Sequence, residues 1–307
     1  MIPLVSIILP NYNHARYLPD RINSILGQTF QNFELIILDD CSTDNSRDVI
    51  EQYRNHPKVT HIVYNEQNGG TSYKQWEKGI AYAKGELIWI AESDDLADVH
   101  FLEYLTPHFK EPKIVLAFSG IQFFIDKIHT KPIMKEIDIR YNGIDFIRDR
   151  LLWGNGICNA SMVLFRKDNY FCVDTNLWSK MKLVGDWMLW TNITSQGDVV
   201  EQPAKLDYCR RHDTNVTGRF RKLGYDFIEG VKVLNFGKRV CNNRFDCKKV
   251  YYKWYDNYIL WSKECTYKTK YKIIKTILCS DFYLGYFFCC KLIRRKIKQI
   301  LCLQKSQ

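Results

Sequence analysis

Three acidic side chains follow directly on an apolar run in the first hundred residues. The run at residues 87–91 ends at Glu92, Asp94 and Asp95, a pattern that predicts a buried strand stopping at an exposed loop. Carboxylates placed this close repel one another unless a cation or hydrogen-bond donors lie among them. Hard oxygen ligands of this kind suit Mg²⁺ or Mn²⁺, commonly together with substrate phosphates. The alternative to a metal site is a polar turn in which Asp95 or Asp98 caps the next helix.

The elements predicted before this loop alternate between strand and helix. Apolar, β-branched runs predict strands at residues 4–9, 34–38 and 59–64, with helical spacing of apolar residues between them. Together with the strand that precedes the acidic cluster, this alternation predicts an open parallel sheet. Ligands of such sheets bind beyond the carboxyl ends of the strands. The polar residues that follow the first two strands there are Pro10, Tyr12, Asn13, Asp39 and Asp40.

Length, cysteines and missing motifs exclude several protein classes. A chain of 307 residues predicts one α/β domain and a smaller C-terminal part. Met1 leads directly into an apolar strand without a basic segment or a cleavage site, so we expect a cytoplasmic protein. The eleven cysteines form no CxxC pair and fit neither a disulfide framework nor a zinc site. No P-loop or GxGxxG sequence occurs, which argues against a kinase, an ATPase or a dinucleotide enzyme.

The positive charge of the chain belongs to its C-terminal region. The net charge is +10, and residues 240–307 hold 15 Lys and Arg against 4 Asp and Glu. Apolar residues alternate with Lys and Arg over residues 291–301, which predicts a basic amphipathic helix. Such a helix lies on a membrane surface or packs on the main domain, and both interpretations stay open. The apolar run at residues 282–290 is too short for a span of ~20 residues, and the alternation gives no reason to expect a nucleic-acid partner.

Five blocks in the first hundred residues are similar, in order and spacing, to the inverting family 2 glycosyltransferases with the GT-A fold. The blocks are residues 6–13 (SIILPNYN), 28–29 (QT), 34–44 (ELIILDDCSTD), 68–70 (NGG), and 83–86 (AKGE) with 92–95 (ESDD). The resemblance implies an α/β fold with a Rossmann-like open mixed sheet flanked by helices and followed by a helical C-terminal extension. It also implies transfer of a sugar from a nucleotide-diphosphate donor, with Mg²⁺ or Mn²⁺ on the diphosphate.

On this resemblance we expect a GT-A catalytic domain at residues 1–219, with a nucleotide-binding half at 1–110 and an acceptor half at 111–219. Residues 220–307 would form the basic helical region. The residues implied in nucleotide binding are Pro10, Tyr12, Asn13, Asp39, Asp40, Gly70, Glu92 and Ser93. Asp39 would contact the base, and Asp40 would support the ribose or its own loop.

The D-x-D motif of the family corresponds to Glu92-Ser93-Asp94 in this chain, with Asp95 next. The resemblance implies Asp94, Asp95 and His212 as metal ligands. Glu92 is longer than the usual Asp by one methylene, so whether Glu92 or Asp95 touches the metal stays open. A second departure stands at residues 76–79 (WEKG), where many relatives carry Arg-Asn before the Gly.

His212 closes a block at residues 208–212 that resembles the Tyr-Arg-x-His block of many relatives. The resemblance implies that Arg210 or Arg211 stabilises the departing diphosphate, where negative charge develops. A purely structural role for the histidine is the alternative.

Asp186 begins a strongly apolar segment and looks like the acid of the family's Glu-Asp-Trp block, with Gly185 in place of the Glu. The resemblance implies that Asp186 is the base that takes the proton of the acceptor hydroxyl. The alternative is a helix cap worth ~1 kcal/mol. Asp174 and Glu201 are lesser candidates for the base.

The combined expectation is an inverting, metal-dependent glycosyltransferase that extends a surface polysaccharide or another glycan. Its partners would be a nucleotide-sugar donor, a glycan or lipid-linked acceptor, and the inner face of a membrane, contacted peripherally through the C-terminal basic helix. A catalytically silent nucleotide-sugar-binding protein on the same fold is the alternative from another class, because Glu92 and Gly185 depart from the family pattern.

Overall fold

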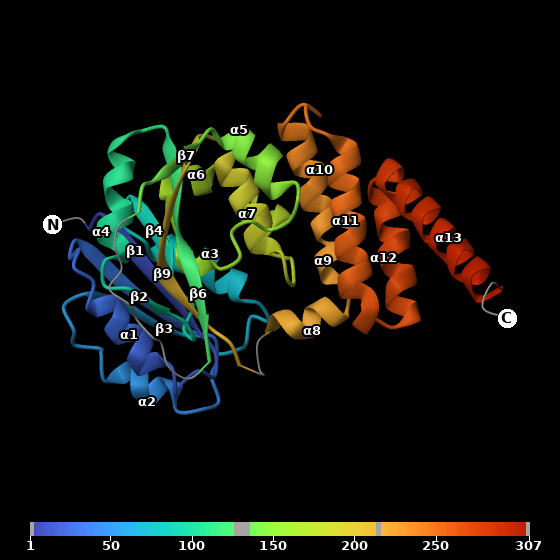
Figure 1. Cartoon of the computed structure of the whole chain (residues 1–307). Coiled ribbons are helices and arrows are strands. Elements are labelled where there is room, and N and C mark those ends of the chain that lie inside the picture. The colour runs from blue at the N-terminus through green and yellow to red at the C-terminus, as the bar shows by residue number, and fades with distance from the viewer. Residues whose placement is uncertain (1–2, 126–135, 213–215, 305–307) are drawn as a thin grey trace. The chain divides into compact units, whose positions relative to one another are not determined.

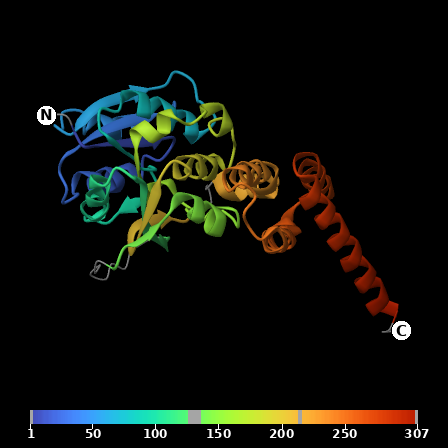
Figure 2. The same cartoon turned by 90° about the horizontal axis from the view of Figure 1, so that it is seen from above.

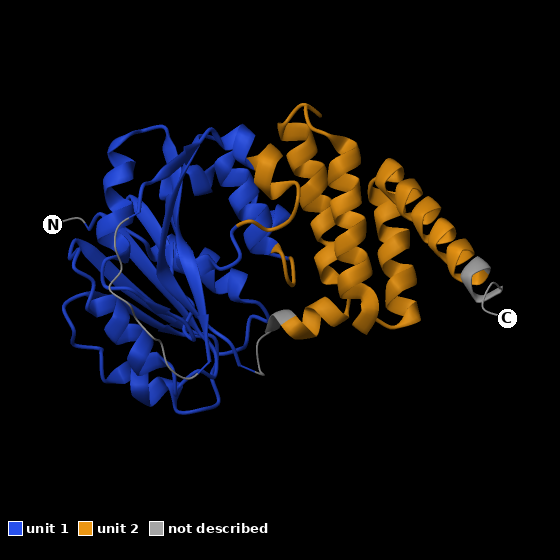
Figure 3. Ribbon diagram, in the orientation of Figure 1, with its two compact units in different colours: residues 1–146, 157–180, 185–214 blue, residues 147–156, 181–184, 215–307 orange. Residues whose placement is uncertain are grey.

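The computed structural model describes residues 3–125, 136–212 and 216–304. The chain divides into two compact units, blue and orange in Figure 3. Unit 1 comprises residues 1–146, 157–180 and 185–214, and unit 2 comprises residues 147–156, 181–184 and 215–307.

The first half of unit 1 alternates strand and helix as the sequence predicts. Its elements are β1 (Val5–Asn11), α1 (Leu18–Leu26), β2 (Phe33–Asp39), α2 (Ser46–Glu51), β3 (Val59–Tyr64), α3 (Ser72–Tyr82) and β4 (Leu87–Ile90). Just before α2, Asp44 Oδ1 accepts a hydrogen bond from the backbone N–H of Ser46 at 3.0 Å.

The second half of unit 1 contains longer strands and short helices. Its elements are β5 (Leu96–Ala97), α4 (Phe101–Leu105), β6 (Ile114–Phe124), β7 (Ile139–Tyr141), α5 (Gly143–Phe146), β8 (Val163–Arg166), α6 (Lys167–Phe171), α7 (Gly185–Thr194) and β9 (Asp198–Arg210). Helix α5 gives way to a wider helical turn at Ile147–Leu151.

Within the described residues, nine strands form one sheet at the centre of unit 1 (Figure 1). The strand order is β3-β2-β1-β4-β8-β6-β9-β5, and β7 pairs with β9. The first four strands of this order run parallel. Strand β8 is antiparallel to both β4 and β6. The open mixed sheet predicted from the sequence is therefore correct.

Helices cover both faces of the parallel part of the sheet. On one face, Ile7 and Leu9 of β1 share a fully buried core with Ile22 of α1. On the other face, α3 approaches so closely that a Cβ on Gly79 would lie 2.4 Å from the Ile8 side chain. Strands covered on both faces need apolar residues at successive positions, which explains the unbroken apolar runs of the sequence.

Unit 2 consists of helices together with two short segments from earlier in the chain, residues 147–156 and 181–184. The helices are α8 (Val216–Lys222), α9 (Tyr225–Ile228), α10 (Gly230–Val240), α11 (Cys247–Trp261), α12 (Tyr267–Ser280) and α13 (Phe282–Gln304). The buried carboxylate of Glu229 holds the segment 182–184, since it accepts backbone N–H groups of Lys182 at 2.7 Å and Leu183 at 2.9 Å. In the part of the chain that the structure describes, no helix has both the length and the apolar composition needed to cross a bilayer.

Candidate active site

The carboxyl ends of β1, β2 and β4 meet at one edge of the sheet. Asn11 at the end of β1 pairs in register with Asp39 at the end of β2, and Ile8 in β1 pairs with Ile90, the last residue of β4. Parallel strands that end together bring the residues after them into one region. The nucleotide-binding and metal-ligating residues predicted from these strand ends are thereby placed along a common edge.

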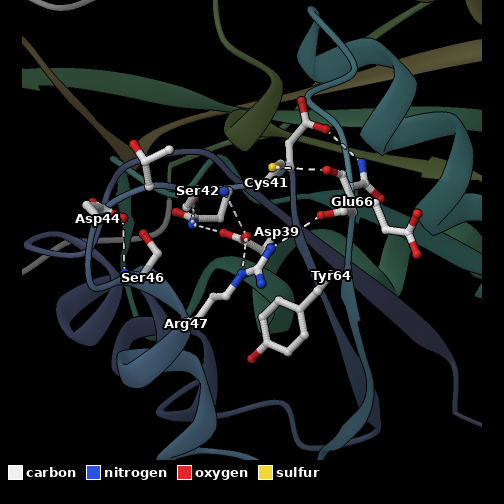
Figure 4. A network of polar contacts seen from close by, with 12 residues as sticks. Asp39, Cys41, Ser42, Asp44, Ser46, Arg47, Tyr64 and Glu66 are labelled. Carbon is white, nitrogen blue, oxygen red and sulfur yellow. Dashed lines mark hydrogen bonds and ion pairs between the residues drawn. The ribbon is translucent and has the colours of Figure 1, made fainter.

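Asp39 lies in a polar network that ties the end of β2 to the following loop (Figure 4). Its fully buried carboxylate accepts hydrogen bonds from Asn11 Nδ2 at 2.9 Å and from the backbone N–H of Ser42 at 3.0 Å. Arg47 Nε lies 3.5 Å from the same carboxylate, and this side chain is 46% exposed and stacked over Tyr64. The Arg47 contact is the longest of these three and is half-exposed. A nucleotide base that binds Asp39, as the sequence predicts, could take the place of Arg47.

Asp40 holds the loop at residues 68–70. Its Oδ1 accepts hydrogen bonds from the backbone N–H of Gly69 at 2.9 Å, from Gln75 Nε2 at 2.7 Å and from Asn65 Nδ2 at 2.7 Å. Of the two roles predicted for Asp40, this geometry favours support of the loop. Gly70 follows with φ of 81°, a backbone conformation that glycine adopts without strain.

The other predicted nucleotide residues lie close by on the loop after β1. Tyr12 is exposed. Asn13 has φ of 55°, and its Oδ1 accepts the backbone N–H of Thr43 at 2.7 Å, which fixes this loop against the one after β2. Pro10 is buried within β1, which extends two residues further than predicted. The two loops thus form a connected rim beside Asp39.

Glu92 and Trp76, which both stand in blocks that depart from the family pattern, are hydrogen-bonded to each other. The indole Nε1 of Trp76 in α3 donates to Glu92 Oε1 at 2.8 Å. Burial, reinforced by the neighbouring Asp94 and Asp95 carboxylates, raises the pKa of Glu92 to about 8. The Glu92 side chain therefore has the Trp76 indole as its hydrogen-bond donor.

Asp94 contacts His212, which lies just beyond β9. The distance from Asp94 Oδ2 to His212 Nε2 is 2.9 Å, and both side chains are mostly buried. Burial acts to raise the pKa of Asp94, but the His212 hydrogen bond and the nearby His14 and His212 imidazoles outweigh it and leave that pKa below its usual value. Asp94 is thus held in the ionised form that a metal ligand requires.

His14 completes a cluster of metal-binding character and is not among the residues predicted from the sequence. His14, Asp94 and His212 each offer one ligand atom, and these atoms lie within 4.8 Å of one another. The His14 ring also contacts Ser93 Oγ through Nδ1 at 2.8 Å. Burial lowers the pKa of His14, which favours the neutral imidazole that binds metals. No spacing in the sequence marks His14, because it reaches the cluster from the loop after β1.

Asp95 lies outside this cluster, and its carboxylate is taken up by internal donors. Asn159 Nδ2 and Ser161 Oγ each donate to Oδ2 at 2.8 Å, and the backbone N–H of Arg210 donates to Oδ1 at 3.1 Å. Burial, followed by the charge of Asp94, raises the pKa of Asp95 to about 6. These hydrogen bonds give Asp95 a role in holding the loop, and its contact with a metal stays a prediction. The helix-cap alternative fails for Asp95, because α4 begins six residues later.

Arg210 also holds the acidic loop, whereas Arg211 remains exposed. The Arg210 guanidinium donates through Nε to the backbone oxygen of Asp94 at 3.0 Å and lies between the rings of Tyr17 and Phe124. Arg211 is stacked over Phe123 with its guanidinium carbon 4.1 Å from the ring centre. Of the two arginines predicted to face the diphosphate, Arg211 is therefore the one with an accessible charge.

A buried charge group behind the cluster was not predicted from the sequence. Asp207 in β9 is fully buried and accepts from Asn159 Nδ2 at 2.9 Å, so Asn159 joins Asp207 to Asp95. Arg21 in α1 is also fully buried, and its three guanidinium nitrogens have no hydrogen-bond partner among the described residues. The charges that act on Arg21 are those of Asp95, Asp207, Asp94 and Glu92. Arg21 thus supplies positive charge to the rear of the acidic loop, beside the Trp89 ring.

Asp186 lies in the first turn of α7, one residue after the helix begins. The backbone N–H of Gly185 donates to the Tyr73 hydroxyl at 3.1 Å. A Cβ on Gly185 would lie 2.6 Å from the Tyr73 ring and 2.7 Å from the backbone oxygen of Trp178. Tyr73 therefore fills the space that the family's Glu side chain would enter.

The two lesser candidates for the base have structural partners. Asp174 caps a short helical turn by accepting the backbone N–H of Asn176 at 2.9 Å. Glu201 in β9 accepts the hydroxyl of Tyr141 at 2.8 Å. Both of these carboxylates thus have a structural contact of their own.

We expect Gly185→Ala to lower the free energy of unfolding by ~1–3 kcal/mol, because the added methyl group overlaps Tyr73 and the Trp178 backbone. Thermal unfolding of the purified variant measures this loss. Gly156→Ala is the matched control, since its Cβ would meet Arg150 at an ordinary 3.7 Å. An equal melting temperature for Gly185→Ala and the wild type would contradict the steric account.

Sequence comparisons agree with this architecture. The profile described as "Glycosyl transferase family 2" matches residues 6–171, more than half of the chain. Glycosyltransferase GlyG of Streptococcus pneumoniae is 36% identical over 111 residues, which cover 36% of this chain and 36% of GlyG. The poly(ribitol-phosphate) beta-N-acetylglucosaminyltransferase TarS of Staphylococcus aureus is 26% identical over 200 residues, covering 54% of this chain and 34% of TarS. The chain therefore spans about a third of the length of each of these relatives.

Solved structures share the fold at low sequence identity. The crystal structure of TarS 1–349 in complex with UDP has a TM-score of 0.65 at 17% identity and covers 89% of this chain and 78% of that one. Mannosyltransferase PcManGT from Pyrobaculum calidifontis, in complex with GDP-Man and Mn²⁺, has a TM-score of 0.55 at 14% identity and covers 95% of this chain and 81% of that one. These likenesses establish the GT-A fold predicted from the sequence, and the profile match establishes that this chain belongs to glycosyl transferase family 2.

Proposed function

We propose that this protein is an inverting glycosyltransferase that moves a sugar from a nucleotide-diphosphate donor to a glycan or lipid-linked acceptor. The observation that carries the proposal is the His14, Asp94 and His212 cluster at the carboxyl edge of the sheet. The rim formed by the loops after β1 and β2 lies at the same edge. A nucleotide on that rim can place its diphosphate toward the cluster, which is the arrangement that the family membership leads us to expect.

The donor set of the cluster fits Mn²⁺ better than Mg²⁺. Two imidazole nitrogens and one carboxylate oxygen make a mixed set, whereas Mg²⁺ prefers oxygen ligands and retains several waters. PcManGT, which shares the fold, is a complex with Mn²⁺. When bound, the ion would supply positive charge to the diphosphate as the sugar leaves. Asp94 and His212 would hold it together with His14.

The base in this proposal is Asp186. Its carboxylate accepts the proton of the acceptor hydroxyl while the hydroxyl oxygen forms a bond to the anomeric carbon. The bond between that carbon and the diphosphate oxygen breaks, and the nucleoside diphosphate departs with the electron pair. Arg211 supplies a further positive charge for this leaving group. Attack from the face opposite the leaving group inverts the anomeric centre.

We expect His14→Gln to weaken Mn²⁺ binding by at least ~10-fold, because the variant loses one nitrogen ligand and the support of its neighbours. Isothermal titration of the protein with MnCl₂ measures the change. His61→Gln is the matched control, since His61 lies on β3 and contacts Thr60 and Tyr82 instead. Unchanged affinity in His14→Gln would remove His14 from the proposed ligand set.

The acceptor in this proposal belongs to surface polysaccharide biosynthesis. The support is the name of TarS, which acts on poly(ribitol-phosphate). We further propose that the protein works at the inner face of a membrane, where a lipid-linked acceptor is presented.

A panel of nucleotide sugars with different bases and sugars tests the proposed function. Calorimetry with and without Mn²⁺ identifies the donor, and analysis of released nucleoside diphosphate then measures turnover. We expect one donor to bind with metal dependence and to be hydrolysed slowly without an acceptor. Tight binding with no turnover for any donor and acceptor would favour the catalytically silent alternative, and no binding at all would overturn both.

A further inference from the structure

Helix α13 packs in unit 2 through one face near its start. Leu284 and Phe288 are fully buried, and the Phe288 ring lies 5.6 Å from that of Tyr255 and 5.5 Å from that of Tyr258 in α11. Gly285 lies directly against Leu278 of α12. This packing face explains how α13 is attached to its neighbours.

A second apolar face of α13 is exposed, which ordinary packing does not explain. We call it the α13 stripe, and its members, between 50% and 65% exposed, are Phe282, Tyr286, Ile293, Ile297 and Ile300. Their spacing places them on one side of a helix, because each residue advances by 100°. On the same count, the packing residues Leu284 and Phe288 lie on roughly the opposite side. The C-terminal half of α13 also extends away from the other helices of unit 2 (Figures 1 and 2).

Basic residues border the α13 stripe and fill the side opposite to it. Helix α13 carries five Lys and Arg and no acidic residue. By helical spacing, Arg294 and Lys296 lie on the two borders of the stripe, whereas Lys291, Arg295 and Lys298 lie opposite. Long basic side chains at such borders can keep their apolar stems in a lipid layer and their charges at the headgroups.

The charge of the surrounding surface distinguishes between possible occupants of the stripe. Residues 267–304 hold nine Lys and Arg and one acidic residue, Asp281, which is buried and paired with Lys238. A second copy of this chain would bring the same positive charge to the interface and be repelled. Nucleic acid would match the charge but would leave the apolar side chains in water. An anionic lipid surface matches both properties.

We propose that α13 lies flat in the headgroup region of an anionic bilayer, with the α13 stripe buried in the lipid. This deepens the proposed function by naming the surface that would bring the enzyme to a lipid-linked acceptor. Lipid binding itself requires no catalysis, so an experiment can refute either proposal without refuting the other.

Cosedimentation of the full chain with vesicles tests this inference. We expect binding to phosphatidylcholine vesicles that contain phosphatidylglycerol, and binding at least ~10-fold weaker to pure phosphatidylcholine or in high salt. The double variant Ile293→Glu/Ile297→Glu should lose vesicle binding. Its matched control is Phe171→Glu/Leu260→Glu, which makes the same charge change at two apolar side chains exposed elsewhere. Circular dichroism verifies that both double variants keep their helix content.

Donor hydrolysis in solution, measured on the same proteins, separates the two proposals. We expect Ile293→Glu/Ile297→Glu to hydrolyse donor at the wild-type rate. Equal binding to neutral and anionic vesicles, or full binding by this variant, would overturn the lipid surface. A concentration-dependent dimer that this variant abolishes would overturn it in favour of a second copy. Vesicle binding by a wild-type protein that turns over no donor would instead refute the proposed enzyme and leave this inference standing.

Discussion

We expect sugar transfer by the Asp186→Asn variant to fall by about 10²- to 10⁴-fold while its affinity for the nucleotide-sugar donor stays unchanged. The amide keeps the size and position of the side chain at the start of α7 but cannot accept the proton of the acceptor hydroxyl. Steady-state assays with the donor identified from the panel measure kcat, and calorimetry in the presence of Mn²⁺ measures the donor affinity.

Two other carboxylates serve as matched controls for the Asp186 experiment. Asp174→Asn and Glu201→Gln make the same chemical change at acids with structural partners, so transfer by both should stay within a few-fold of the wild type. If Asp186→Asn transfers sugar at the wild-type rate, its carboxylate is a helix-terminus charge and the base lies elsewhere. If it also loses donor binding, the residue acts on the donor and not on the acceptor.

We expect the Asp94→Ala variant to lose Mn²⁺ binding and sugar transfer together. Asp94 is the one carboxylate in the cluster with two histidines, and without it the diphosphate would have no ion to stabilise its developing charge. We expect transfer and donor hydrolysis to fall by at least ~10³-fold, in line with the removal of a major electrostatic contribution. Mn²⁺ titration and nucleoside diphosphate release are measured on the same preparation.

Glu103→Gln is the charge-matched control for Asp94→Ala. Glu103 is an acid in α4 whose contact is the Thr29 hydroxyl, so its variant should bind Mn²⁺ and transfer sugar normally. Turnover by Asp94→Ala at the wild-type rate would refute the metal site. Loss of transfer with intact Mn²⁺ binding would instead show that His14 and His212 hold the ion without the carboxylate.

The strands of the nucleotide half could be predicted from the sequence, because β1, β2 and β4 are buried along their whole length. Continuous apolar runs such as residues 35–38 predict strands without knowledge of their neighbours. A shared site for Asp94 and His212 could also be predicted, since both residues stand in blocks that resemble the family. These two residues are 118 positions apart, and only the resemblance linked them.

Roles that depend on distant partners were not accessible from the sequence. Asp95 looked like a ligand beside Asp94, but Asn159, 64 positions away, supplies the donor that occupies it. Arg210 looked like a diphosphate contact, yet the rings of Tyr17 and Phe124 enclose it. In both cases the residue type was compatible with several roles, and the tertiary packing selected one.

The departures from the family pattern were coupled in a way that spacing does not reveal. Trp76 and Glu92 looked like two independent changes, but the hydrogen bond between them makes them a pair. Gly185 looked like the loss of a functional acid, and the Tyr73 ring explains why no larger residue fits there.

Arg21 bears on how the protein would handle the proposed ion. A guanidinium does not give up its proton in proteins, so the acidic loop has a permanent positive neighbour on its inner side. The carboxylates of the loop can therefore lie together before any ion binds. Folding would then not depend on the metal, and a bound ion could leave with the nucleoside diphosphate after each catalytic cycle without unfolding the protein.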